Sequence, residues 1–375
     1  MVNLRPSMPY KRIVIKLGTS TLTAGSTRLS PPHLVELVRQ MAGLHSSGSE
    51  VIVVSSGAIA VGRELLGYPQ LPKEIPSKQM LAAVGQPRLM ALYEQLFGLY
   101  GITVAQVLLI SSDFSDRRRY LNSRNTLAAL LSQRIVPIVN ENDTVATEEI
   151  RVGDNDNLSA LVTNLIEADL LALLTDQPGL FTADPRRDPS ADRFVEVSGP
   201  EIPEALWQAA GGTKGSLGTG GMITKLQAAD LARRSGATVV IARGSDPDVL
   251  NQLVNDQPVG TRFSPLESTL ESRKRFILAG GVSAGRIIVD QGAARALGNG
   301  SSLLPVGMHS VEGGFERGDT VRVADLNGRE IARGLVNYAS GDPMRILGHQ
   351  SDEIEQILGY NYGDEVIHRN AMVLL

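Results

Sequence analysis

The chain has 375 residues, and at about 150 residues per domain this length indicates two domains. Its 36 basic side chains nearly balance 40 acidic ones, which excludes a global positive field for holding nucleic acid or an anionic membrane. The absence of cysteine excludes disulfides, thiolate metal sites and a cysteine nucleophile. No apolar run approaches the roughly 18 residues of a membrane span, and the N-terminus has no signal-peptide core, so we expect a soluble, cytoplasmic protein.

Short apolar runs alternate with longer segments of helical periodicity through the first two-thirds of the chain. The predicted strands are 13–15, 50–54, 103–109, 135–139, 170–174 and 238–241. The predicted helices are 32–43, 77–98, 123–132, 157–168 and 225–235. This alternation predicts an α/β fold, a mainly parallel sheet sandwiched by helices, with ligands bound at the carboxyl ends of the strands.

The pattern changes after about residue 264, where a charged, glycine-containing stretch begins with a predicted short helix. We therefore predict a first domain over 8–263, a linker over 264–282 and a second domain with a C-terminal tail over 283–375. The second domain has short β runs that indicate a small β-rich barrel or sandwich. These runs are 286–289, 302–305, 320–323 and 330–336.

Polar or glycine-rich turns follow the predicted strands and are candidates for binding anions or cations. Lys16 precedes a glycine turn, and a glycine-rich loop over 215–225 ends in Lys225 at the start of a helix. That loop is neither a Walker A loop nor a dinucleotide-binding G-x-G-x-x-G motif. The other turns are 55–58, 140–143, 153–157 and 175–179.

Each turn also has a simpler interpretation. A glycine-rich loop is most often a connector, Lys16 would usually be a solvated strand end, and Asp154 and Asp156 would cap a helix. The run 117–119 of three arginines is interpreted as an exposed face, and the five histidines have no metal or triad spacing. One phosphoryl-transfer site would explain all the turns together, whereas the simpler interpretations must hold separately.

Long motifs resemble the amino acid kinase family and, within it, the glutamate 5-kinases, over nearly the whole chain. The matching segments are VIKLGTS (14–20), SSGAIAVGRELLGYP (55–69), SKQMLAAVGQPRLM (77–90), VNENDTVAT (139–147), VGDNDNLSALV (152–162), LLTDQPGLFTADPR (173–186) and LGTGGMITKLQAAD (217–230). The segments DQGAARAL (290–297), SSLLPVG (301–307) and ERGD (316–319) resemble a PUA domain.

The resemblance implies the amino acid kinase fold and ATP-dependent phosphorylation of the L-glutamate 5-carboxylate with Mg²⁺, the first step of proline biosynthesis. It implies that Lys16 and Lys225 contact the phosphates and that Asp156 organises both lysines. It implies that glutamate is held by Ser56, Asp143 and Asn155, with Gly57, Asn140 and Asp154 as neighbours. The implied ATP-binding positions are Lys16, Gly18, Thr175, Asp176, Thr219, Gly220, Gly221, Met222, Ile223, Thr224 and Lys225. No residue is assigned as a metal ligand.

Further expectations from the resemblance are feedback inhibition by proline, hand-off to glutamate-5-semialdehyde dehydrogenase, and a homo-oligomer (dimer or tetramer). The alternatives are a kinase of the same family acting on acetylglutamate, aspartate or uridylate, or an RNA-binding PUA protein. Charge argues against RNA, because residues 283–375 carry eight arginines and no lysine against twelve acidic side chains.

Overall fold

A computed structural model of the chain describes residues 10–146, 155–183, 185, 188–211, 221–266 and 282–375. The chain divides into two compact units, one comprising residues 1–114 and 124–268 and the other residues 115–123 and 269–375. The predicted linker lies mostly outside the described residues, and the predicted domain bounds remain a prediction. No helix in the described part of the chain has the length and apolar character that a membrane crossing requires.

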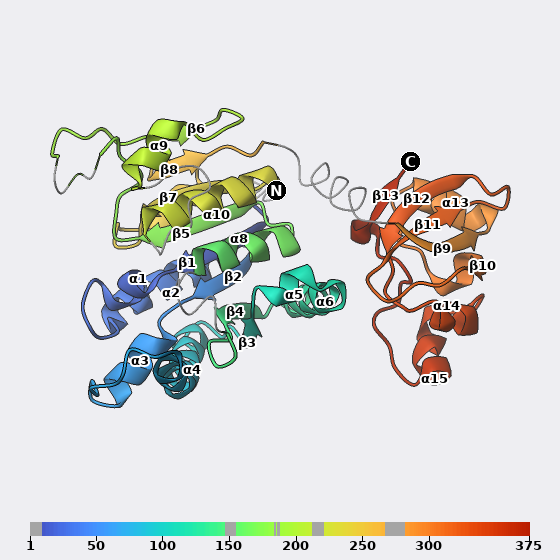
Figure 1. The fold of residues 1–375 in the computed structure, drawn as a ribbon, viewed down its shortest axis with the longest axis horizontal. Coiled ribbons are helices and arrows are strands. Elements are labelled where there is room, and N and C mark those ends of the chain that lie inside the picture. The colour runs from blue at the N-terminus through green and yellow to red at the C-terminus, as the bar shows by residue number, and fades with distance from the viewer. Residues whose placement is uncertain (1–9, 147–154, 184, 186–187, 212–220, 267–281) are drawn as a thin grey trace, which may run out of the picture. The chain divides into compact units, whose positions relative to one another are not determined.

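The first unit is built on an eight-stranded sheet with the order β3-β4-β2-β1-β5-β7-β8-β6 (Figure 1). Its strands are β1 (Arg12–Leu17), β2 (Glu50–Ser55), β3 (Val104–Leu109), β4 (Val136–Glu141), β5 (Leu170–Thr175), β6 (Glu196–Val197), β7 (Thr238–Arg243) and β8 (Thr261–Phe263). All neighbours pair in parallel except β7 and β8. The predicted α/β fold with a mainly parallel sheet is confirmed.

The helices of this unit follow the predicted segments and add several short ones. They are α1 (Thr19–Thr23), α2 (Pro31–Ser46), α3 (Ala58–Leu65), α4 (Ile75–Gly98), α5 (Ser112–Ser115), α6 (Arg117–Ser132), α8 (Asn155–Leu165), α9 (Glu204–Ala209), α10 (Met222–Arg234) and α11 (Val249–Val254). The first residues of α6 group with the second unit. This helix starts six residues before the predicted position, because the prediction stopped at the preceding arginines.

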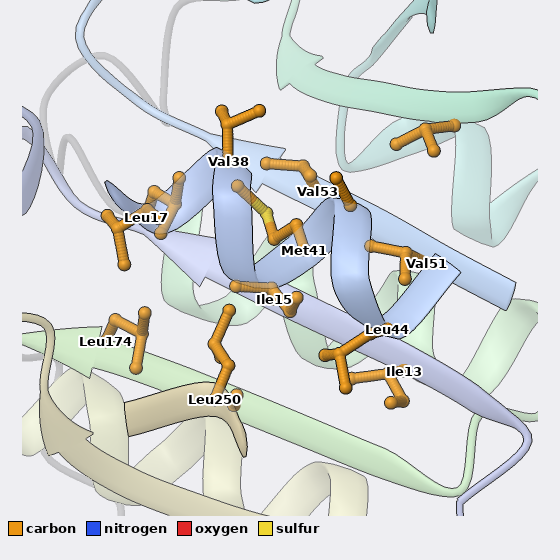
Figure 2. Close-up of a cluster of buried hydrophobic side chains, with 14 of the residues drawn as sticks. Ile13, Ile15, Leu17, Val38, Met41, Leu44, Val51, Val53, Leu174 and Leu250 are labelled. Atoms are coloured by element: carbon orange, nitrogen blue, oxygen red, sulfur yellow. The ribbon is translucent and has the colours of Figure 1, made fainter. Parts of the chain in front are cut away.

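Residues of alternate parity in β1 face opposite sides of the sheet, since side chains of a strand point alternately up and down. Ile13, Ile15 and Leu17 pack with Val38, Met41 and Leu44 of α2, as Figure 2 shows. Leu250 of α11 and Leu174 of β5 belong to the same buried cluster. Lys16 therefore faces the other side, which α8 covers where it packs against β1, β2 and β5.

Two glycines allow α3 and α4 to cross with their backbones in contact. A Cβ added at Gly62 would lie 1.9 Å from the carbonyl oxygen of Leu81, and one added at Gly85 would lie 1.9 Å from that of Ala58. Any larger side chain at either position would push the helices apart. The close crossing fixes the position of the middle of α4 against the first turn of α3.

The second unit contains a five-stranded sheet with the order β10-β9-β11-β12-β13. Its elements are β9 (Val282–Val289), α13 (Gln291–Gly298), β10 (Met308–Glu312), β11 (Thr320–Ala324), β12 (Glu330–Leu335), α14 (Gly341–Ile346), α15 (Ile354–Leu358) and β13 (Met372–Leu374). The strand predicted at 302–305 is wrong, because that segment forms a single bridge from Leu303 to Ile367 and then a 3₁₀ turn.

Residues 115–123 pack within this second unit. Leu121 is buried beside Leu335 and Ala371. Arg118 pairs with Glu316 at 2.6 Å, and Arg117 lies 3.8 Å from Asp319, although both arginines stay more than 40% exposed. The three arginines are exposed as predicted, and two of them, Arg117 and Arg118, also pair with acidic side chains.

Candidate functional site

Lys16 is a buried lysine in the central strand of the first sheet. Its residue is 5% exposed, and its ammonium forms an ion pair with Oδ1 of Asp156. A buried charge is tolerated only when it is paired or neutralised. The simpler interpretation of Lys16 as a solvated strand end is therefore wrong.

Asp156 lies in the first turn of α8 and bridges two lysines. Its Oδ2 accepts a hydrogen bond from Nζ of Lys225 at 2.9 Å, while its Oδ1 contacts Lys16. Burial alone would raise the pKa of Asp156, but the two ammonium groups outweigh burial and hold its pKa below the ordinary value. The side chain thus stays ionised at neutral pH. Asp156 therefore does more than occupy the first turn of α8, because its carboxylate forms ion pairs with both lysines.

Gly221 precedes α10 and lets the chain enter the helix that carries Lys225. Its backbone, with φ +92° and ψ −148°, is open to glycine and strongly disfavoured for other residues. Thr224 Oγ1 lies 2.9 Å from the Gly221 carbonyl oxygen and 2.9 Å from Asp156 Oδ2. Met222 and Ile223 occupy the first helical positions. Thr219 and Gly220 lie outside the described residues.

A chain of side-chain amides lies beside this ionic cluster. Nδ2 of Asn155, the residue before Asp156, donates to the Ser55 carbonyl oxygen at 2.6 Å and to Oδ1 of Asn140 at 2.8 Å. Nδ2 of Asn140 donates to Oε1 of Gln86 at 2.8 Å. The network joins the carboxyl ends of β2 and β4 to α8 and α4, so the neighbouring turns predicted from the sequence meet here.

The remaining predicted glutamate positions lie on neighbouring turns. Ser56 and Gly57 follow β2, and Gly57, with φ +99°, is the N-cap of α3. Asp143 is half-buried in the turn after β4, and burial raises its pKa to about 6 against the opposing charge of Lys78. Within the described residues these three form no hydrogen bond to Asn140 or Asn155. Asp154 lies outside the described residues.

The predicted nucleotide positions continue from the lysines to the end of β5. A Cβ added at Gly18 would lie 3.3 Å from Lys16 Nζ, so glycine keeps space around that ammonium. Thr175 ends β5, and its hydroxyl donates to Oδ1 of Asp176 at 3.0 Å.

A mostly apolar pocket of about 260 Å³ follows this strand end. Its lining includes Leu180, Phe181, Leu206, Ala210 and Met222. Of these five residues, the sequence analysis assigned a role only to Met222. Leu180 and Phe181 lie in the matching segment 173–186, and Leu206 lies in the short apolar helix α9 just before the glycine-rich loop.

Two family models match the sequence of this chain. The model of the amino acid kinase family matches residues 11–243, and that of the PUA domain matches residues 285–358. The chain belongs to the amino acid kinase family. The match covers the strands and helices that carry Lys16, Asp156 and Lys225.

Curated relatives extend the similarity to nearly the whole chain. A glutamate 5-kinase of Photobacterium profundum is 58% identical over 98% of this chain and 97% of its own. A glutamate 5-kinase of Cronobacter sakazakii is 57% identical over 96% of this chain and 98% of its own. A solved UMP kinase from Bacillus anthracis aligns with a TM-score of 0.47 at 15% identity, covering 69% of this chain and 98% of that one. The relatives named here as glutamate 5-kinases favour that reaction over the alternative substrates.

Proposed function

We propose that the chain transfers the γ-phosphoryl group of ATP to the 5-carboxylate of L-glutamate, giving L-glutamyl 5-phosphate and ADP. This is the reaction that the name of its 58%-identical relative describes, and it is the first step of proline biosynthesis. The observation that carries the proposal for the site is the pair of lysines held on the two oxygens of one buried carboxylate. We infer that Lys16 and Lys225 are catalytic and that Asp156 holds them.

The reaction needs charge neutralisation more than a base. The attacking carboxylate of glutamate is ionised at pH 7, because its reference pKa is about 4.3, and so no side chain has to remove a proton. The transferred phosphoryl group carries negative charge over its oxygens in the transition state. The ammonium groups of Lys16 and Lys225 supply the compensating charge, and Asp156 restrains both of them.

The amide network supports the amino acid end of the site. Both hydrogens of Asn155 Nδ2 are used by Ser55 and Asn140, so only its Oδ1 can turn to a substrate. An amide oxygen and an ionised Asp143 are suitable acceptors for the ammonium of glutamate. Ser56, Gly57 and Asp154 complete the proposed glutamate site.

The nucleotide end uses the carboxyl end of β5 and the start of α10. We infer that the apolar pocket receives the adenine base beside Thr175 and Asp176, with the phosphates toward Gly18, the stretch 219–224 and the lysines. Asp156 is already engaged by both ammonium groups, so Mg²⁺ would be held on the ATP phosphates and add further positive charge there.

Magnesium-dependent release of ADP with glutamate tests the proposed activity. Glutamate should support turnover, whereas acetylglutamate, aspartate and UMP should not. Release of ADP with one of those substrates and not with glutamate would overturn the proposal. The same assay with proline added at low glutamate tests feedback inhibition, and repeating it on a chain ending near Ser264 tests whether the second unit is needed.

We also propose three properties that are expected from the sequence and its resemblance. Because an acyl phosphate hydrolyses readily, we propose hand-off of the product to glutamate-5-semialdehyde dehydrogenase. We also propose a homo-oligomer and a cytoplasmic location, which sedimentation and cell fractionation would test.

A further inference from the structure

The orientation of each amide in the network is fixed by backbone groups that cannot reverse their roles. The Ser55 carbonyl can only accept, so Asn155 must present Nδ2 to it. The Glu141 backbone N–H can only donate, and it lies 2.9 Å from Asn140 Oδ1, so Asn140 must present its oxygen there. The amide orientations are thus determined by hydrogen bonding as well as by position.

The orientation of the Asn140 amide in turn determines the orientation of the Gln86 amide. Asn140 must use Nδ2 on the side of Gln86, and that group can only donate, so Gln86 must present Oε1 to it at 2.8 Å. Its own Nε2 group then points away from Asn140. That nitrogen is buried and has no hydrogen-bond partner among the residues that the structure describes.

A buried N–H group without an acceptor is costly, and native proteins rarely leave one unpaired. Gln86 is also held in place, because its neighbour Gly85 packs against the Ala58 carbonyl with no room for a side chain. The side chain therefore presents a fixed donor at the end of a network that includes two of the proposed glutamate-site residues, Asn140 and Asn155.

We propose that Gln86 is a substrate-binding residue whose Nε2 donates a hydrogen bond to a carboxylate oxygen of the amino acid substrate. The inference rests on the proposed function, because an amino acid is the ligand that needs both acceptors and a donor. Asp143 and Asn155 Oδ1 supply acceptors for the ammonium. Gln86 Nε2 supplies a donor for an anionic oxygen.

Two substitutions separate this role from a structural one. Gln86→Glu keeps an oxygen for Asn140 but replaces the free donor with a second oxygen, which would repel the substrate carboxylate. Gln86→Met removes both groups at similar size. If Gln86 only supports Asn140, then Gln86→Glu should behave like the wild type and Gln86→Met should be impaired.

Substrate binding through Nε2 predicts that both variants bind glutamate about 10- to 100-fold more weakly, with Gln86→Glu at least as weak as Gln86→Met. The KM for ATP should stay within about twofold, because the proposed nucleotide site at the ends of β5 and α10 does not include Gln86. Glutamate affinity is measured by calorimetry, and KM and kcat by ADP release. The matched control is Gln95→Glu, which adds the same charge at an exposed position of α4 and should change nothing.

The split between the two kinetic parameters identifies the carboxylate. A higher KM with an unchanged kcat assigns the hydrogen bond to the α-carboxylate, and a lower kcat assigns it to the reacting 5-carboxylate. Wild-type affinity in Gln86→Glu, with the wild-type chain active, overturns this inference alone. A wild-type chain that neither binds nor phosphorylates glutamate overturns the proposed function together with the inference.

Discussion

Two consecutive residues of α8 enter networks of opposite character. Asp156 is surrounded by cations and holds Lys16 and Lys225 through charge. Asn155 is surrounded by neutral groups and is held by Ser55 and Asn140 through directed hydrogen bonds. Ion pairs place charge but constrain angles weakly, whereas amide hydrogen bonds determine which atom faces which partner. Under the proposed function, one turn of α8 would therefore contribute to both the phosphate site and the amino acid site.

The largest effect should come from removing the negative charge of Asp156 from its ion pairs with Lys16 and Lys225. Asp156→Asn leaves the ammonium groups of Lys16 and Lys225 without their carboxylate, although those side chains are only 6% and 11% exposed. We expect a loss of about 3 to 5 kcal/mol in the free energy of unfolding and more than about 10³-fold in kcat. Urea unfolding and ADP release measure the two quantities.

The matched control for Asp156→Asn is a surface ion pair. Glu36→Gln breaks the exposed contact with Arg39 and should cost under about 1 kcal/mol. If Asp156→Asn were no more destabilising than Glu36→Gln, the buried carboxylate would not be the group that stabilises the lysines.

Lys225→Ala should affect catalysis more than folding. Asp156 keeps Lys16 as a partner, so the chain should fold, while kcat should fall by about 10² to 10³. The KM values for glutamate and ATP should change much less. An unchanged kcat in an assay saturated with magnesium would remove Lys225 from the catalytic role.

Asp143 should make glutamate use depend on pH. Its pKa in the folded chain is about 6, and protonation below that pH removes the negative charge that we propose attracts the substrate ammonium. The kcat/KM for glutamate should therefore fall about tenfold per pH unit below pH 6, while kcat/KM for ATP stays flat. Asp143→Ala should abolish this decrease of kcat/KM at low pH and raise the KM for glutamate at pH 7.5. The KM for ATP should change little.

The same pKa has an opposite consequence for stability. The pKa is raised from 3.8 to about 6 on folding, so the folded chain binds the proton more tightly than the unfolded chain. The contribution of Asp143 to the free energy of unfolding is therefore full below pH 4 and declines as pH rises toward 6.

For the kinetic prediction, equal changes in the KM values for glutamate and ATP in Asp143→Ala would exclude direct contact of Asp143 with glutamate.

The smallest effect should come from a substitution at the crossing of α3 and α4, which positions Gln86 of the amide network. Gly85→Ala forces a Cβ against the Ala58 carbonyl and should lower the free energy of unfolding by about 1 to 3 kcal/mol. Gly43→Ala is the control, because that exposed helical position in α2 has open space, and alanine there should stabilise by up to about 1 kcal/mol. Thermal melting of both variants makes the comparison.

The sequence was sufficient for the architecture of the first unit. A parallel sheet covered on both faces needs strands that are apolar throughout, and the buried runs in β2, β5 and β7 are of that kind. The second unit was harder, since its shorter strands pair irregularly and the run 302–305 has no ladder partner beyond one bridge. Short apolar runs carry little information about pairing.

The site was predictable only in part. The resemblance identified Lys16, Asp156 and Lys225, but spacing alone left Lys16 as a solvated strand end. Lys16 is buried because α8 covers it, and α8 lies about 140 residues later in the sequence. Gln86 lay within a matching motif but was assigned no role, because the direction of an amide hydrogen bond depends on groups from three separate elements.

The position of β1 between β2 and β5 also has a consequence for the order of synthesis. Lys16 is made early, whereas its partner Asp156, the adjoining strand β5 and finally Lys225 emerge much later. At about 5 to 20 residues per second, roughly 10 to 40 s separate the two lysines on the ribosome. Through most of that interval β1 lacks its partner strand β5, and Lys16 lacks the carboxylate of Asp156, so the sheet of the first unit cannot be completed early in synthesis.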